Sequence, residues 1–180
     1  MCPVDDLTTS RRALTAKVTL DACVFSGGSA GTDGGAVYAQ FATLLEVVDS
    51  TFVANSAVDR GGAVHLMATT ARFERGALES NVASSGGALY TSAGDVTLTD
   101  AALRANTASG ASGGGGALAS ATALTLKGAS DWHENAARGG DGGALRLTAG
   151  ARLVGALNAS GNEATDGTAS TRAARDDRYS

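Results

Sequence analysis

Short stretches of alternating apolar and polar residues recur along the whole chain. Residues 18–20 read Val-Thr-Leu, residues 96–98 read Val-Thr-Leu and residues 124–126 read Leu-Thr-Leu. Alternation of this kind predicts a β-strand with one buried and one exposed face. Further stretches of the same type lie at residues 46–48, 72–74 and 153–154. The pattern therefore predicts an all-β protein built from many short strands.

A second element, Gly-Gly-Ala followed by Val or Leu, recurs at nearly constant distance. The five copies begin at Gly34, Gly61, Gly86, Gly115 and Gly142. The intervals between them are 27, 25, 29 and 27 residues. Recurrence at this length is typical of solenoids, in which each repeat is one structural unit. We expect the glycine pair to make a tight bend, because glycine adopts positive φ at little cost.

A third element, an apolar residue followed three positions later by asparagine, precedes most of the glycine pairs. The pairs are Phe52 and Asn55, Leu78 and Asn81, Leu103 and Asn106, Trp132 and Asn135, and Ala159 and Asn162. The first repeat has Phe25 but carries Gly28 in the asparagine position. Asparagines at equivalent positions of stacked repeats can bond one another through their amides. We therefore predict a structural ladder of Asn55, Asn81, Asn106, Asn135 and Asn162.

Together these motifs resemble the Gly-Gly-Ala and Phe-x-x-Asn repeats of the chlamydial polymorphic outer-membrane proteins and of related right-handed β-helix proteins. The resemblance covers roughly residues 18 to 169, and Phe52 with Asn55 keeps the strict Phe-x-x-Asn form. It implies a parallel β-helix of the kind also found in pectin lyase-like proteins. It further implies an adhesin-like role outside the cell or at its surface.

The predicted fold is a right-handed parallel β-helix of about six coils with ~27 residues per coil. Residues 17–170 would form this β-helix, residues 1–16 a lead or cap, and residues 171–180 a polar tail. Each coil reads strand, turn, apolar-x-x-Asn, variable loop and Gly-Gly-Ala strand. The last repeat has Gly-Thr-Ala at residues 167–169 in place of the glycine pair. We therefore expect that the chain is a segment of a longer solenoid or an incomplete gene product.

Composition fits a narrow apolar interior and excludes several classes of partner. Aromatic residues make up only 4% of the 180 residues, proline occurs once and the net charge is −4. This charge argues against nucleic acid as a partner. No apolar run is long enough to span a membrane, and no secretory signal is seen near the N-terminus. Cys2 and Cys23 match no metal-ligand spacing. The favoured interpretation is that Cys2 is an exposed thiol and Cys23 a small strand residue, and the alternative is a disulfide between them.

The charged residues do not predict an enzyme. Asp33, Asp59 and Asp141 lie near the glycine pairs but at unequal distances from them, whereas catalysis requires groups that converge on one rigid site. A carbohydrate-active enzyme resembling a polyuronate lyase or hydrolase, or an inactive remnant of one, is the alternative. A calcium repeat would need an aspartate every nine residues. We therefore expect no metal and no cofactor.

One row of side chains indicates a function. Alternation sends the residue after Gly-Gly-Ala inward and the next one outward; the outward row is Tyr38, His65, Tyr90, Ala119 and Arg146. The corresponding row on the first strand of each coil is Thr19, Glu46, Arg72, Thr97 and Thr125. An ordinary solvated surface, with Glu46 and Arg72 as a pair between coils, is the alternative interpretation.

From this row we predict that Tyr38, His65, Tyr90 and Arg146 contact a ligand, because tyrosine and arginine are frequent at binding hot spots. The partner would be a glycan or a cell-surface protein. The predicted function is therefore a non-enzymatic, extracellular or surface-displayed binding module, or a passive scaffold.

Overall fold

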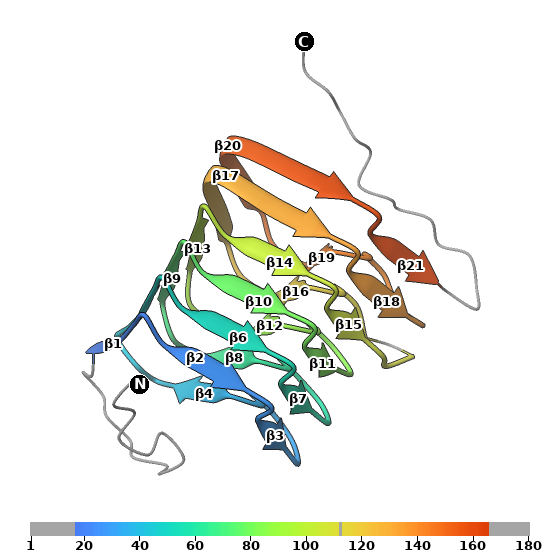
Figure 1. Ribbon diagram of the computed structural model, residues 1–180, viewed down its shortest axis with the longest axis horizontal. Helices are drawn as coiled ribbons and strands as arrows, with labels where there is room; N and C mark the ends of the chain where they lie inside the picture. Colours follow the sequence, from blue (N-terminus) through green and yellow to red (C-terminus); the bar gives the residue numbers. More distant parts are fainter. Residues whose placement is uncertain (1–16, 112, 166–180) are drawn as a thin grey trace.

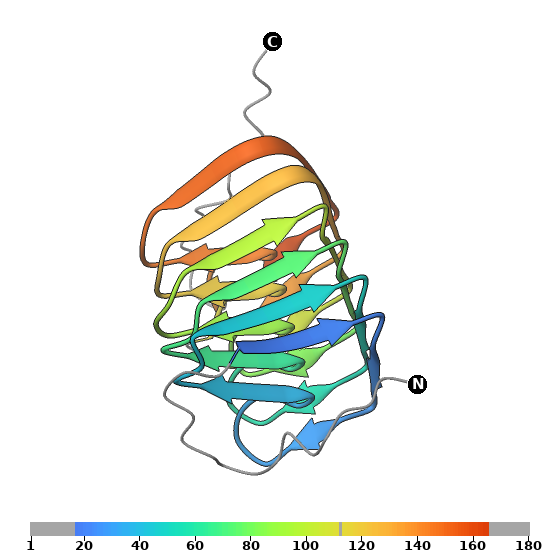
Figure 2. The same cartoon turned by 90° about the vertical axis from the view of Figure 1, so that its left-hand side faces the viewer.

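The computed structural model describes residues 17–111 and 113–165, and every regular element in them is a β-strand. The strands are stacked coil upon coil, and each coil lies directly over the one before it (Figures 1 and 2). Every strand pair is parallel and joins neighbouring coils. This arrangement confirms the predicted parallel β-helix.

The largest sheet bends around a corner of the helix. Its first arm contains β1 (Lys17–Asp21), β5 (Leu44–Val48), β9 (Ala71–Glu74) and β13 (Val96–Thr99). Its second arm contains β2 (Val24–Ser26), β6 (Thr51–Val53), β10 (Ala77–Glu79) and β14 (Ala102–Arg104). In the last two coils, β17 (Leu124–His133) and β20 (Ala151–Ser160) run through both arms without a break.

Two further sheets close each coil. The six-stranded sheet contains β3 (Ser29–Ala30), β7 (Ser56–Ala57), β11 (Val82–Ala83), β15 (Thr107–Ala108), β18 (Ala136–Arg138) and β21 (Glu163–Thr165). The five-stranded sheet contains β4 (Val37–Gln40), β8 (Val64–Met67), β12 (Leu89–Thr91), β16 (Leu118–Ser120) and β19 (Leu145–Leu147). The described residues thus form five complete coils and, with β20 and β21, part of a sixth.

The interior is a set of stacked apolar columns. Val64 of β8 pairs with Leu89 of β12, so equivalent inward residues lie one above another. The Phe25 and Phe52 rings stack with centroids 4.8 Å apart and an angle of 5° between their planes. Trp132 is buried in the same column, as a core residue should be. Small repeats with few aromatic residues can therefore still fill the narrow core.

The asparagines form a continuous hydrogen-bonded ladder. Each Nδ2 donates to Oδ1 of the asparagine in the next coil, over distances of 3.1, 3.0, 3.0 and 2.8 Å from Asn55 to Asn162. Each Nδ2 also donates to a main-chain carbonyl of the preceding coil, such as that of Leu78 for Asn106. Each Oδ1 from Asn81 onward accepts the backbone N–H of the asparagine before it. Hydrogen bonding therefore uses both the donors and the acceptor of these amides.

The ladder holds a left-handed turn. The residue before each asparagine has positive φ even when it is not glycine, with values of 54° at Ala54, 55° at Ser80, 51° at Ala105 and 54° at Glu134. This conformation is unfavourable for a residue with a Cβ atom. The hydrogen bonds of the next residue, the asparagine, compensate for the strain.

The two glycines of each pair are required for different reasons. The first, such as Gly61, has φ of 61°, and a Cβ atom there would lie 2.1 Å from the carbonyl oxygen of Val64. The second, Gly62, does not have positive φ, but its Cβ would lie 2.1 Å from the carbonyl oxygen of Gly87 in the next coil. The prediction that both glycines serve the bend is therefore incomplete, because the second permits close contact between coils.

Several sequence predictions concern residues beyond this part of the structure. The lead at 1–16, the tail at 171–180 and Cys2 lie outside the described residues. Cys23 is buried and disulfide-bonded, so the favoured interpretation of it as an unbonded strand residue is wrong. No helix suited to crossing a membrane occurs in residues 17–111 and 113–165.

Candidate ligand-binding face

The register of the five-stranded sheet brings together three rings from successive coils. Tyr38 pairs with His65, and His65 pairs with Tyr90. The imidazole contacts both phenol rings edge to face, with centroids 5.1 Å from Tyr38 and 5.2 Å from Tyr90. We call these three residues the aromatic row. Edge-to-face packing of this kind is favourable for aromatic pairs.

Only part of the aromatic row is exposed. Tyr38 is 40% exposed and Tyr90 is half-buried, whereas His65 is only 1% exposed. The alternation correctly placed His65 on the outward side of the strand, but it did not show that the two tyrosines would cover the imidazole. His65 therefore supports the two tyrosine rings from between them and does not itself offer a contact surface.

The environment of His65 keeps its side chain neutral. Its Nδ1 lies 3.3 Å from Oδ2 of Asp33, but the direction does not suit a hydrogen bond, and within the described residues neither ring nitrogen has a hydrogen-bond partner. Burial lowers the pKa of His65, and the positive charge of Arg60 acts in the same direction. The Asp33 carboxylate raises this pKa but does not outweigh the burial.

A second row runs beside the aromatic row, formed by the residue directly before each glycine pair. Isolated parallel bridges join Asp33 to Arg60, Arg60 to Ser85, and Gly114 to Asp141. The guanidinium carbon of Arg60 lies 5.3 Å from the centroid of the Tyr90 ring, a cation–π contact. Arg60 was not predicted as a site residue, although its position directly before the glycine pair was the available signal.

Arg146 stands apart from the three rings. Ala119 separates it from Tyr90 in the register of the sheet, so the structure does not place all four predicted contact residues side by side. The Arg146 side chain lies along the backbone of the preceding coil. Its Cδ is so close to Gly114 that a Cβ atom on this glycine would be 2.4 Å away from it. The site therefore has three rings and Arg60 at the first three coils and a second basic group, Arg146, at the fifth.

The acidic residues near the glycine pairs do not form a catalytic cluster. Asp33 and Asp141 belong to the same row but lie in the first and fifth coils, and Asp59 lies outside that row. In the described part of the chain, no group of three or more histidine, cysteine, aspartate or glutamate residues could hold a metal ion.

A different polar cluster lies on the exposed side of β17 and β20. His133 Nδ1 lies 2.5 Å from the Ser160 hydroxyl, and its Nε2 contacts Asp131 Oδ1. Asp131 is also bonded by Arg104 at 2.7 Å and by Asn158 at 3.1 Å. The hydrogen bond from Arg104 lowers the pKa of Asp131, so this carboxylate stays ionised. The order serine, histidine, aspartate was not anticipated, because the three residues come from two different coils.

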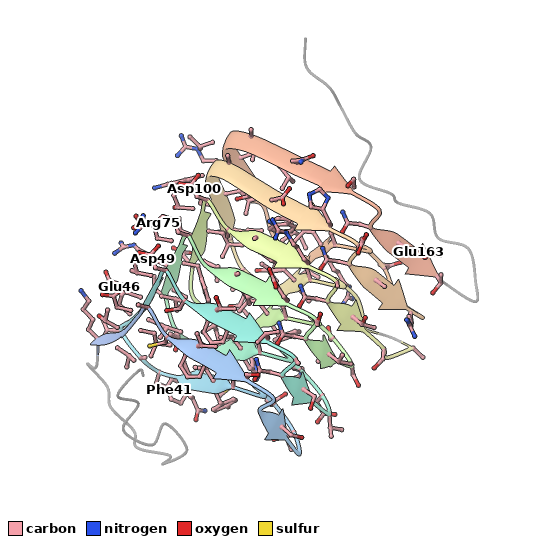
Figure 3. All side chains as sticks on the ribbon, in the orientation of Figure 1. Phe41, Glu46, Asp49, Arg75, Asp100 and Glu163 are labelled. Carbon is pink, nitrogen blue, oxygen red and sulfur yellow. The ribbon has the colours of Figure 1, made fainter. Side chains whose placement is uncertain are left out.

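Charged side chains also line the corner between the two arms of the large sheet (Figure 3). Glu46 lies 2.7 Å from Lys17 and 3.8 Å from Arg72, which gives the pair between coils expected for a solvated face. Arg75 bonds Asp49 and lowers the pKa of that carboxylate. Exposed pairs of this kind contribute little to stability.

These features describe a solenoid with one aromatic and basic face and two solvated, charge-paired faces. Compared with protein-family models, with curated proteins and with solved structures, the chain has no significant match.

Proposed function

We propose that this protein is a non-enzymatic binding module that contacts its partner through the face of Tyr38, Tyr90 and Arg146. The observation that carries the proposal is the aromatic row, in which a buried histidine holds two partly exposed tyrosine rings in fixed positions. Rings that are already ordered lose little conformational freedom when a ligand binds. The partner in this proposal is a glycan or a protein on a cell surface.

The proposed place of action is the cell surface or the extracellular space. The Gly-Gly-Ala and Phe-x-x-Asn motifs, which resemble the chlamydial outer-membrane protein repeats, support it. The disulfide bond of Cys23 also supports it, since disulfides persist mainly in oxidising compartments. An adhesin-like role is the form of binding that best fits both observations.

A screen against glycans and cell surfaces tests the proposal. The parent protein is compared with a Tyr38→Ser, Tyr90→Ser double variant and with Val24→Ser, a matched control that removes an exposed apolar side chain from β2. We expect the double variant to lose about tenfold or more in affinity at unchanged melting temperature, and the control to bind as the parent does. If the double variant binds as well as the parent, or if the parent binds nothing, a passive scaffold is the better description.

A second candidate, a hydrolase, depends on the contact of Ser160 with His133 and Asp131. A serine nucleophile needs an adjacent base that is oriented by a third group, and these residues lie in that order. The cluster is on a solvent-exposed strand face, however, and catalysis also needs donors for a developing oxyanion. Labelling of Ser160 by a fluorophosphonate, absent in His133→Gln, would support the hydrolase, and absence of labelling in the parent would exclude it.

A further inference from the structure

Two arginines beside the aromatic row lack an acidic partner. Within the described residues, Arg60 and Arg146 have no carboxylate within 4.0 Å. By contrast, three arginines on or beside the large sheet are paired: Arg72 with Glu46, Arg75 with Asp49 and Arg104 with Asp131. The acid nearest to Arg60 in its row, Asp33, points its carboxylate to His65 instead. The charge of both guanidinium groups is therefore available to a ligand.

The fold directs both side chains to the same line of residues. Arg60, Ser85 and Gly114 occupy equivalent positions in three successive coils, and Arg146 lies along Gly114. Because neighbouring coils are about 4.8 Å apart, Arg60 and the Arg146 side chain are separated by about 10 Å. Between them lie the Tyr90 ring and small residues, of which Ala119 is one.

We propose that the ligand of this face is an acidic glycan whose carboxylates are bound by Arg60 and Arg146 while a sugar ring lies against the tyrosines. This inference rests on the binding function proposed above and specifies its ligand. The planar guanidinium fork matches a carboxylate with two parallel hydrogen bonds. Aromatic side chains supply rigid apolar contact area with little entropy loss.

An acidic peptide fits this face less well. Extended peptides commonly bind by adding a strand to the edge of a sheet. On the aromatic face, the backbone of β8 and β12 is already paired to the coils on both sides. A ligand can therefore reach only side chains there, which favours a chain of sugars with its charged and apolar groups on the outside.

The test is a calorimetric titration of the whole protein with a hyaluronan tetrasaccharide, whose alternate sugars carry a carboxylate, and with its methyl ester, which is neutral. We expect the acid to bind at least tenfold more tightly than the ester, and more weakly as salt is added. Arg60→Ser and Arg146→Ser should each weaken binding about tenfold. Arg152→Ser, which removes from β20 an exposed arginine that has no ion pair among the described residues, is the matched control and should change affinity less than about twofold.

The inference is wrong if the acid and the ester bind alike, or if oligoglutamate binds and the tetrasaccharide does not. It is also wrong if the tetrasaccharide does not bind at all. In each of these cases the binding function itself survives only if the screen finds some ligand whose affinity falls in the Tyr38→Ser, Tyr90→Ser variant. If neither the screen nor the titration finds a ligand, both the binding function and the acidic-glycan inference are wrong.

Discussion

Replacing Asn106 with alanine should destabilise the protein more than the same change at Asn162, the last asparagine of the ladder. Asn106 is fully buried and takes part in four side-chain hydrogen bonds. Alanine would remove the acceptor of the Asn81 backbone N–H and of one Nδ2 proton of Asn81, and the donor to the carbonyl of Leu78. At about 1–1.5 kcal/mol for each of these three lost hydrogen bonds, the loss is about 3–4.5 kcal/mol.

The same change at Asn162 should cost less. Asn162 also accepts from the backbone and side chain of its neighbour, Asn135, and donates to the carbonyl of Trp132. It is only partly buried, so water can replace the lost partners. We therefore expect a loss of about 1–2 kcal/mol, which leaves a difference of about 2 kcal/mol between the two positions.

Urea unfolding followed by circular dichroism measures this difference as the change in midpoint at constant slope. Asn158→Ala is the control, because this exposed asparagine lies on β20 outside the ladder and makes one surface hydrogen bond; its loss should stay below about 0.5 kcal/mol. If Asn106→Ala and Asn162→Ala lower the free energy of unfolding equally, burial does not determine how much each asparagine of the ladder contributes to stability, and the prediction is wrong.

Three further predictions concern backbone geometry and charge. Gly87→Ala should unfold or severely destabilise the protein, because its Cβ would lie 2.1 Å from a carbonyl oxygen of the next coil; Gly76→Ala, where the nearest atom is 3.7 Å away, should leave the melting temperature almost unchanged. Ala105→Gly should raise the free energy of unfolding, measured in urea, by about 0.5–1 kcal/mol. Glycine removes the strain of the positive φ at this position, and this gain exceeds the cost of the greater entropy of the unfolded chain. A lower free energy of unfolding would show that the backbone at Ala105 is not strained. Burial depresses the pKa of His65 below its unfolded value of about 6.5, so the unfolded chain binds the proton first and stability should fall as pH drops below about 6.5, by at most about 1.4 kcal/mol per pH unit. In urea titrations at several pH values, His65→Gln should reduce this slope; an equal slope in the variant and the parent would contradict the assignment.

The repeat unit was predictable because each of its residues meets a local requirement. Asn55 and Asn81 recur at one position since every coil must close the same left-handed turn, and Val64 alternates with its neighbours since one side of its strand faces the core. The requirement for Gly62 was not visible in the sequence, because it arises from the backbone of another coil. The residues that build each coil can thus be predicted from the sequence of that coil alone, whereas contacts between coils can be predicted only when the register of the strands is known.

The candidate site shows the same division. Alternation placed Tyr38, His65 and Tyr90 on one side of the sheet, but it could not show that the outer rings would bury the imidazole. Arg60 was missed because it belongs to a turn and not to a strand, and only the stacking of coils brings it over Tyr90.

The central claim is that the two tyrosines of the aromatic row, Tyr38 and Tyr90, contact the ligand, and hydroxyl-radical footprinting tests it most directly. Tyr38 is exposed, and His133 on β17 is a reactive side chain on another sheet. The protein is oxidised with and without the ligand that the screen identifies, and modification of each residue is measured by mass spectrometry. The account predicts that the ligand protects Tyr38 and leaves His133 unchanged. Equal oxidation of Tyr38 in both samples, with protection at His133 or elsewhere, would contradict it.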